Sequence, residues 1–200
     1  MRIILASGSP RRKDLLTQAG LRFEVLVSDA DESVEGEPYE QVAALAKRKA
    51  NAVVERVAGP ALIIAADTLV YTESRNGTGR ILGKPKDAAQ AYDMLQALQG
   101  RKHTVYTGVA ILKVNDSTDM PPEMNVFVDA AYVHFRPLTP REINAYIATG
   151  EPFDKAGAYG IQEKGALLIE RVEGDFYTVM GLPVSKLCVQ LEDMGVQVWG

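Results

Sequence analysis

Apolar and polar residues alternate in blocks along the first half of the chain, and each block has the length of one strand or one helix. Apolar runs predict strands at residues 2–5, 23–27 and 61–66. The third run is continuously apolar and rich in β-branched residues, which is typical of a central strand covered on both faces. Periodic apolar positions between the runs predict two helices, which begin at Pro10 and Pro38.

The second half of the chain has consecutive strands and three further helices. Strands are predicted at 103–114 and 126–135, a glycine-rich loop at 151–165, and a hairpin around Gly174-Asp175. Helices are predicted from Asp87 to Gly100, from Thr139 to Gly150, and after Pro183. Asp87 with Gln90, and Thr139 with Glu142, both have the spacing of a capping box.

This order of elements predicts an α/β fold with a mixed, twisted sheet flanked by helices. Alternating strands and helices favour parallel pairing in the first half, whereas consecutive strands favour antiparallel pairing in the second. Two polar insertions, at 72–79 and 115–124, lie between apolar runs, so we expect exposed hairpin tips there. Because neither insertion resembles a linker, residues 1–200 are predicted to form a single domain.

Length and charge narrow the classes of function. The 200 residues are 46% hydrophobic and 24% charged, which is ordinary for a soluble globular protein with its own core. The net charge of −4 opposes a general nucleic-acid binder, since phosphate contacts need an excess of Lys and Arg. No apolar run approaches the ~20 residues of a membrane span. We therefore expect a cytoplasmic protein that binds neither nucleic acid nor membrane.

Cysteine and histidine are too sparse to suggest familiar metal or nucleophile chemistry. The single Cys188 can form neither an intramolecular disulfide nor a cysteine zinc site. The two histidines, His103 and His134, are far apart in the sequence. A histidine metal site or a Ser-His-Asp triad therefore has little support.

The segment from Ser7 to Arg12 joins the first strand to the first helix and has an unusual charge pattern. Arg11 and Arg12 stand in the first helical turn, where the helix dipole is already positive, so cations there cost stability unless an anion binds. The hydroxyls of Ser7 and Ser9 and the backbone N–H groups would complete an anion site. The alternative is that Ser9 is an ordinary N-cap and that both arginines are solvated.

Asp67 directly follows the apolar run 61–66. The carboxyl end of a strand is where open α/β sheets bind ligands, so Asp67 is a candidate functional residue. The alternative is that Asp67 only caps the strand or the turn after it.

Three other polar segments have both a functional and a structural interpretation. The basic run 47–49 lies on the second helix, and such a run is usually a solvated face. Asp29, Asp31 and Glu32 could supply oxygen ligands for Mg²⁺ or Mn²⁺, although an acidic turn before a helix is common. The glycine-rich segment 154–162 would suit recognition of a flat polar base, and it would equally suit an irregular loop.

Five short motifs together resemble those of the Maf family, and their order and spacing agree along nearly the whole chain. They are Leu5-Ala6-Ser7-Gly8-Ser9-Pro10-Arg11-Arg12, Ala66-Asp67-Thr68, Gly83-Lys84-Pro85, residues 103–109 and Gly157-Ala158-Tyr159-Gly160-Ile161-Gln162. The family is named for a septum-formation phenotype. Its members act as nucleoside triphosphate pyrophosphatases, with a fold similar to the inosine triphosphatase group. The segment 154–162 resembles the branch that hydrolyses dTTP and UTP, as opposed to the branch that handles 7-methyl-GTP.

The resemblance implies a role for individual residues. Asp67 matches the proton acceptor of the family, and Glu32 with Asp67 would hold a divalent metal, Mg²⁺ or Mn²⁺, or orient water. Substrate-binding positions are matched by Ser7, Arg11, Arg12, Lys49, Thr68, Lys84 and Gln162. Of these, Arg11, Thr68 and Gln162 match positions associated with substrate choice. Ala66 stands where the family commonly has glycine, a change too small to question the activity.

The implied reaction is cleavage between the α and β phosphates of dTTP, UTP or a modified pyrimidine nucleotide, which gives a monophosphate and pyrophosphate. An alternative is a regulator of cell division that senses a nucleotide in the same pocket without turnover. That alternative predicts binding without steady release of pyrophosphate. The sequence leaves open a homodimer, the physiological substrate, and whether Asp67 acts as base, metal ligand or both.

Overall fold

A computed structural model describes residues 1–73, 77–115 and 121–199. The strands within these ranges are β1 (Arg2–Leu5), β2 (Glu24–Val25), β3 (Ala61–Glu73), β4 (Gly79–Leu82), β5 (Lys102–Val114), β6 (Glu123–Phe135) and β7 (Ile169–Glu173). The α-helices are α1 (Pro10–Gln18), α2 (Pro38–Val54), α3 (Ala88–Leu98), α4 (Pro140–Ile147), α5 (Phe176–Met180) and α6 (Val184–Asp193). Three 3₁₀ helices follow α4, namely η1 (Glu151–Asp154), η2 (Ala156–Ala158) and η3 (Glu163–Leu168).

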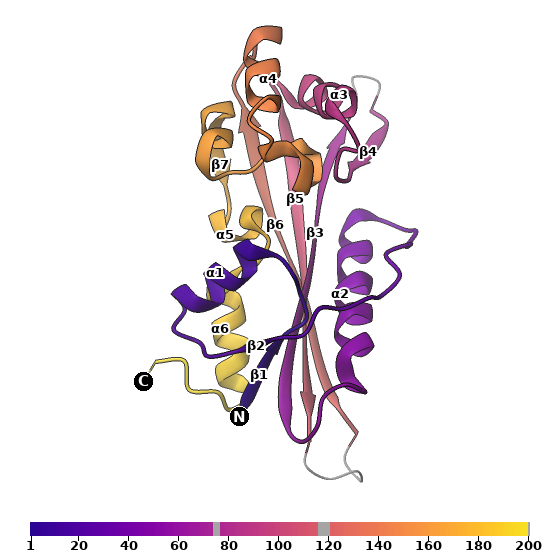
Figure 1. Cartoon of the computed structure of the whole chain (residues 1–200), viewed down its shortest axis with the longest axis vertical. Helices are drawn as coiled ribbons and strands as arrows, with labels where there is room; N and C mark the ends of the chain where they lie inside the picture. The colour runs from indigo at the N-terminus through magenta and orange to yellow at the C-terminus, as the bar shows by residue number, and fades with distance from the viewer. Residues whose placement is uncertain (74–76, 116–120, 200) are drawn as a thin grey trace. The chain divides into compact units, whose positions relative to one another are not determined.

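The strands form one mixed sheet, and helices lie beside it (Figure 1). The strand order is β2-β1-β3-β5-β6-β7, and β4 pairs with β3. β1 pairs in parallel with both β2 and β3, whereas the β3–β4 and β6–β7 pairs are antiparallel. The predicted α/β fold with a mixed sheet is therefore confirmed.

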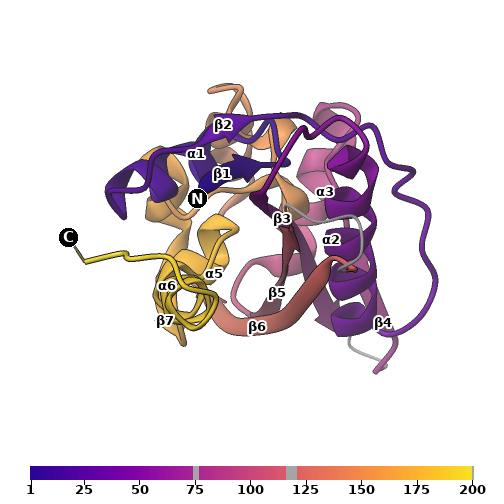
Figure 2. The ribbon, with the colours of Figure 1, turned by 90° about the horizontal axis from the view of Figure 1, so that it is seen from below.

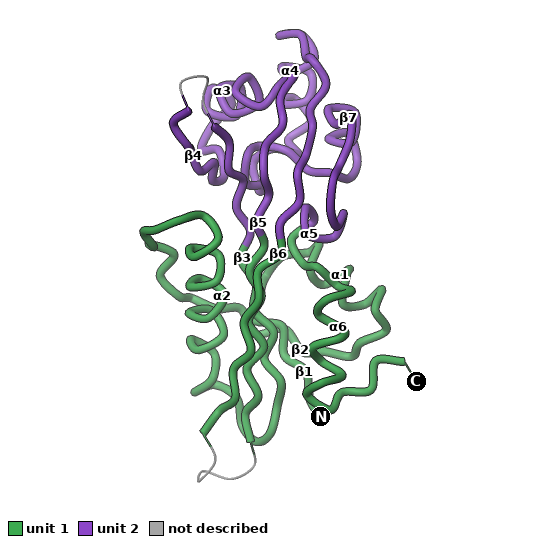
Figure 3. Tube along the Cα trace, turned by 180° about the vertical axis from the view of Figure 1, so that it is seen from behind, with its two compact units in different colours: residues 1–67, 107–129, 181–200 green, residues 68–106, 130–180 purple. Residues whose placement is uncertain are grey.

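The chain divides into two compact units, which Figure 3 shows in different colours. Unit 1 comprises residues 1–67, 107–129 and 181–200, and unit 2 comprises residues 68–106 and 130–180. β3, β5 and β6 each contribute residues to both units. The single domain predicted over residues 1–200 stays a prediction.

In unit 1, α2 covers one face of the sheet, and α1 and α6 lie on the other (Figures 1 and 2). The core between α2 and the sheet is built from small and branched side chains of both: Ile4, Ala6, Ala46, Ala50, Val53, Ala61, Ile63, Ala65, Ala110 and Leu112. Leu62 and Ile64 are also fully buried, and strand alternation directs them to the opposite face. The central strand predicted from the run 61–66 is thus covered on both sides.

Gly108 of β5 lies directly against the backbone of α2. A Cβ atom built on this glycine would overlap the carbonyl group of Val42, in the second turn of α2. Because backbone cannot retreat as a flexible side chain can, only glycine fits this approach. Gly108 therefore sets the depth at which α2 lies on the sheet.

In unit 2, a second core lies between the sheet and helices α3 and α4. Its buried side chains include Leu95, Phe135, Ile143, Tyr146 and Tyr159. α4 begins with the predicted capping box, since Thr139 Oγ1 accepts from the Glu142 N–H and Glu142 Oε2 accepts from the Thr139 N–H. At α3 only half of the predicted box forms. Asp87 Oδ1 accepts from the Gln90 N–H, but the Gln90 side chain accepts from the Lys86 N–H.

The strand predicted to stop before Asp67 instead continues to Glu73. Beyond the last β1 pair, Leu5 with Ile64, β3 finds a new partner in β4, from Val70 with Leu82 to Glu73 with Gly79. Asp67 therefore lies within β3, and the strand that ends near it is β1. This pairing confirms a hairpin at the first insertion, although residues 74–76 lie outside the described ranges.

Three further predictions are corrected or fall partly outside the described residues. The hairpin predicted at Gly174-Asp175 is wrong, because Asp175 begins a helix: its Oδ1 accepts from the Tyr177 N–H and its carbonyl oxygen accepts from the Thr178 N–H. β2 has only two residues where five were predicted. In the second insertion, residues 116–120 lie outside the described ranges. Among the described residues, no helix is long and apolar enough to cross a membrane.

Candidate active site

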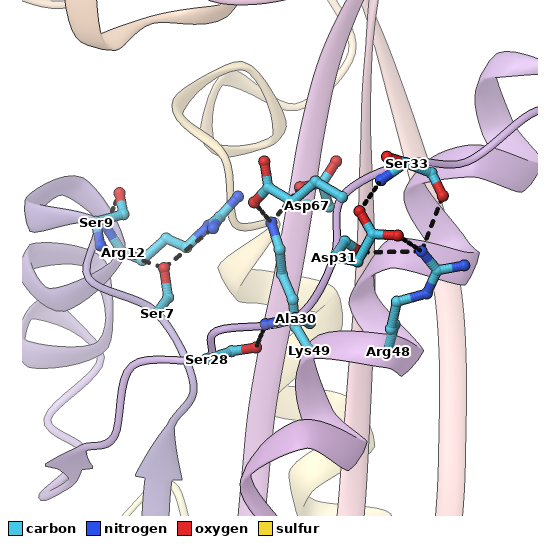
Figure 4. A network of polar contacts seen from close by, with 11 residues as sticks. Ser7, Ser9, Arg12, Ser28, Ala30, Asp31, Ser33, Arg48, Lys49 and Asp67 are labelled. Atoms are coloured by element: carbon cyan, nitrogen blue, oxygen red, sulfur yellow. Dashed lines mark hydrogen bonds and ion pairs between the residues drawn. The ribbon is translucent and has the colours of Figure 1, made fainter.

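The segment between β1 and α1 forms a network of hydroxyl and arginine contacts (Figure 4). Ser7 Oγ accepts from the backbone N–H of Ser9 at 3.2 Å and from Arg12 Nη1 at 3.1 Å. Arg12 Nε donates to the carbonyl oxygen of Gly181 at 2.8 Å. Ser9 Oγ also accepts from the Arg12 N–H at 3.5 Å, so Ser9 is indeed an N-cap. Arg12, however, is held against the backbone and is not a fully solvated side chain.

Two carboxylates, Asp67 and Glu32, act on the Arg12 guanidinium through their charge. Its burial lowers the pKa of Arg12, the charges of Asp67 and Glu32 oppose that shift, and the charge of Arg11 adds to it. Arginine nevertheless stays protonated in proteins. Both arginines and both carboxylates predicted for the site therefore belong to one electrostatic neighbourhood within unit 1.

Lys49 joins the two carboxylates predicted to hold a metal. Its Nζ lies 2.6 Å from Asp67 Oδ1 and 2.7 Å from Glu32 Oε1. The side chains of Lys49 and Asp67 are only 13% and 15% exposed, whereas that of Glu32 is 68% exposed. Lys49 thus differs from Lys47 in the same basic run, which is exposed. The interpretation of this run as a solvated face does not describe Lys49.

A separate set of contacts holds the acidic segment beside α2. Arg48 Nη1 donates to the carbonyl oxygens of Asp31 and Ser33, both at 2.9 Å. The Ser33 N–H donates to Asp31 Oδ1 at 3.0 Å, and this bond lowers the pKa of Asp31. Asp31 therefore shapes the turn, and the turn presents Glu32 to Lys49.

The donor atoms at this site suit a hard divalent cation. Oxygens of Glu32 and Asp67 already converge on one cationic atom, the ammonium of Lys49. Within the described ranges, no group of three or more His, Cys, Asp or Glu side chains gathers for a metal. Mg²⁺ is commonly held by one or two carboxylates together with substrate phosphates and water. The two carboxylates fit that pattern of binding.

Lys84 and Gln162 belong to unit 2, on segments that contact each other. The Gly157 N–H donates to the carbonyl oxygen of Gly83 at 3.0 Å, which ties the glycine-rich loop to the residue before Lys84. Gln162 precedes η3, makes no side-chain capping bond to it and is exposed. Thr68 follows Asp67 in β3, so strand alternation directs its side chain to the opposite face.

Sequence reasoning missed the contacts that support the glycine-rich loop. Tyr146 of α4 accepts from the Gly160 N–H at 3.1 Å, and His103 Nε2 lies 2.7 Å from Tyr159 Oη. Tyr159 lies 56 residues from His103 in the sequence, and no local pattern links the two. One signal could have pointed to this contact: His103 and Tyr159 each belong to one of the five motifs that resemble the family.

The mixed α/β sheet carries a cluster of arginine, lysine and carboxylate side chains, the groups that commonly meet phosphates and divalent cations in proteins. The chain belongs to the Maf family, because the family model described as Maf-like protein matches residues 2–194.

Individual relatives are similar over nearly their full length. A protein of Bacillus anthracis named dTTP/UTP pyrophosphatase is 45% identical over 199 residues, which cover 98% of this chain and 97% of the relative. A protein of the same name from Bacillus cytotoxicus is 47% identical over 193 residues, 96% of this chain and 94% of the relative. Among solved structures, the Staphylococcus aureus Ham1 protein matches with a TM-score of 0.48 and 14% identity, over 97% of this chain and 100% of that one.

Proposed function

We propose that this chain hydrolyses the bond between the α and β phosphates of dTTP and UTP and releases a nucleoside monophosphate and pyrophosphate. The observation that carries the proposal is the cluster in unit 1, where Lys49 bridges Glu32 and Asp67 beside Arg12. The names of the Bacillus relatives support the choice of substrate.

Cationic side chains would bind the triphosphate. Arg12 is already oriented by Ser7 and Gly181, so its guanidinium needs little reorganisation to meet a phosphate. Arg11 precedes it in the first turn of α1, where backbone N–H groups also favour an anion. Lys49 and Lys84 add positive charge from α2 and from the segment after β4. These groups stabilise the charge that develops on phosphoryl oxygens during cleavage.

Asp67 is the proposed proton acceptor. Lys49 Nζ holds its Oδ1 atom, and Oδ2 is the oxygen that would take a proton from the attacking water. Glu32 and Asp67 are the residues that would hold a divalent metal. When bound, such a metal would polarise phosphoryl oxygens and offset their negative charge. Glu32 is the more exposed of the two carboxylates, so it can move to accommodate a metal and nucleotide that arrive together.

Gln162 is the proposed reader of the base. Thymine and uracil present an acceptor, donor and acceptor edge, and the Gln amide can supply both a donor and an acceptor. Cytosine replaces the O4 acceptor by an amino donor and lacks the N3 proton, so groups of the site would be left without partners. Tolerance of both dTTP and UTP requires space for the 5-methyl group and no strict contact with the 2′-hydroxyl.

Release of pyrophosphate from a panel of nucleotides tests this function. We expect steady turnover of dTTP and UTP, and much slower turnover of CTP, ATP, GTP and 7-methyl-GTP. Nucleotide binding without pyrophosphate release would instead support the alternative of a sensor in cell division. A homodimer, a cytoplasmic location, and the lack of nucleic-acid and membrane partners stay predictions from the sequence.

A further inference from the structure

Two polar side chains, His103 and Tyr159, meet in the interior of unit 2. His103 Nε2, from β5, lies 2.7 Å from Tyr159 Oη, between η2 and η3. The two residues are only 3% and 5% exposed. This hydrogen bond therefore lies within the core, where it is shielded from competing water.

Aromatic rings enclose the bond. The Phe135 ring packs edge-on against His103 at 5.1 Å and against Tyr159 at 4.7 Å between ring centroids. His103 Nδ1 is buried and has no hydrogen-bond partner among the described residues. A buried polar atom without a partner destabilises a fold, so an apolar side chain would suit mere packing better than an imidazole. The bond to Tyr159 is the feature of His103 that packing does not explain.

The backbone of the loop that contains Tyr159 is strained on both sides of residues 159–162, the segment that ends at Gln162. Ala158 and Glu163 have left-handed backbone conformations, with φ of 61° and 55°. Non-glycine residues adopt such conformations only where surrounding contacts enforce them. Two side chains from outside the loop restrain it here: His103 Nε2 meets the Tyr159 hydroxyl, and Tyr146 Oη accepts from the Gly160 N–H. Tyr159 is three residues before Gln162, so its anchoring restricts where Gln162 can lie.

We propose that His103 is a positioning residue, whose hydrogen bond to Tyr159 fixes residues 159–162 in the conformation that aims Gln162 at the nucleotide base. This inference rests on the proposed function, because it uses Gln162 as the reader of the base. His103 itself touches no substrate in this scheme. Burial, with a smaller contribution from His134, lowers the pKa of His103 to about 3, so the imidazole is neutral at physiological pH.

The test compares Tyr159→Phe, His103→Leu and the double variant in the full chain. Selectivity is the dTTP-to-CTP ratio, measured both as kcat/KM for turnover and as Kd for binding at low temperature in chelator. We expect each single variant to lower this ratio about tenfold, mainly through KM for dTTP, and the double variant to lower it no further. Both single changes remove the same bond, so their effects should not add. His103→Gln, which keeps a hydrogen-bonding side chain, should restore part of the ratio.

Tyr132→Phe is the matched control, because it removes a tyrosine hydroxyl from a residue of the same unit that is 42% exposed. It should leave the ratio unchanged. Wild-type selectivity in folded Tyr159→Phe and His103→Leu would overturn the inference, as would additive losses in the double variant. If His103→Leu fails to fold, the nearly isosteric Tyr159→Phe decides.

The failure of the proposed function has a different signature. It appears as a parent protein that releases no pyrophosphate from any triphosphate, while Kd ratios still report on the loop. Loss of discrimination in Gln162→Ala, together with full discrimination in Tyr159→Phe, would overturn the positioning role alone. A parent that neither hydrolyses nor discriminates would overturn both.

Discussion

Lys49 of α2 places its ammonium 2.6 Å from Asp67 Oδ1 in β3, and both side chains are largely buried. A partly buried ion pair is sensitive to loss of either partner, because the remaining charge is left without compensation. Here Lys49 also contacts Glu32, so one cation orients two carboxylates. The pair links the helix that carries the basic run to the strand that carries the proposed proton acceptor.

Asp67→Asn should lower kcat by at least ~100-fold, because it removes a positioned base or metal ligand while it preserves the shape of the side chain. The amide oxygen can still accept from Lys49, so the circular dichroism spectrum should match that of the parent. Activity within a few-fold of the parent would rule out the assignment of Asp67 as the proton acceptor.

Arg12→Ala should raise KM for dTTP and lower kcat/KM, since a charge-assisted contact to phosphate is lost. The free energy of unfolding should change by no more than about 1 kcal/mol, because lost bonds to Ser7 and Gly181 are offset by removal of a cation from a helix N-terminus. Arg141→Ala is the matched control, in the first turn of α4 after Pro140. Equal kinetic effects at the two arginines would contradict a specific anion site.

Chelation should abolish pyrophosphate release, and Mg²⁺ or Mn²⁺ should restore it. Glu32→Gln should raise the concentration of Mn²⁺ needed for half-maximal activity, because one of two carboxylate ligands is removed. Titration of Mn²⁺ by electron paramagnetic resonance, with and without nucleotide, measures binding independently of turnover. Full turnover in excess chelator would remove the metal from the reaction.

Gln162→Ala should lower the dTTP-to-CTP ratio of kcat/KM more than it lowers hydrolysis overall. Each unpaired polar group at the base is worth roughly 1–3 kcal/mol of discrimination. Steady-state kinetics with both nucleotides measure the ratio. The assignment to the dTTP and UTP branch is wrong if the parent favours 7-methyl-GTP or if the variant keeps full discrimination.

His103 should make the protein less stable in mild acid. Its folded-state pKa of about 3 lies below the value of about 6.5 expected in the unfolded chain. Between these values the unfolded state binds a proton that the native state does not, so stability falls as pH drops below about 6.5. The contribution should reach about 2 kcal/mol at pH 5.

Urea unfolding of the parent and of His103→Gln at pH 7 and pH 5 measures this contribution. It is the change in the free energy of unfolding between the two pH values in the parent minus the same change in the variant. The variant should lose less stability than the parent on acidification. Equal losses in the two proteins would show that His103 does not stay neutral in the native state.

Local signals in the sequence were sufficient for most helix starts. Thr139 and Glu142 lie three residues apart and satisfy each other whatever the rest of the chain does, so their capping box could be predicted. The end of β3 could not, because its extension past Asp67 depends on pairing with β4. Asp175 shows the same limit, since a Gly-Asp pair serves a hairpin or a helix cap equally well until its partners are known.

The residues of the candidate site also fall into those that local sequence predicts and those that it does not. The serines and arginines near α1 are adjacent in the sequence, so their helix position and charge were enough to predict an anion site. Family resemblance was needed to place Lys49 with Asp67, because the basic run alone indicated a solvated face. The contact between His103 and Tyr159 depends on how β5 and the loop after η2 pack together, which no local pattern encodes.

Gly108 has a consequence for how this protein can vary. Its missing side chain lets α2 approach β5 at Val42, and Lys49 lies two helical turns further along. Position 108 should therefore accept no other amino acid in a saturation library selected for activity. Yet Gly108 is far from Asp67 in the sequence and has no functional group. Even alanine there would lift the helix from the sheet and carry the Lys49 ammonium away from its carboxylates. Gly108, whose role is only to let α2 pack closely, would then be as intolerant of mutation as Asp67, the proposed proton acceptor.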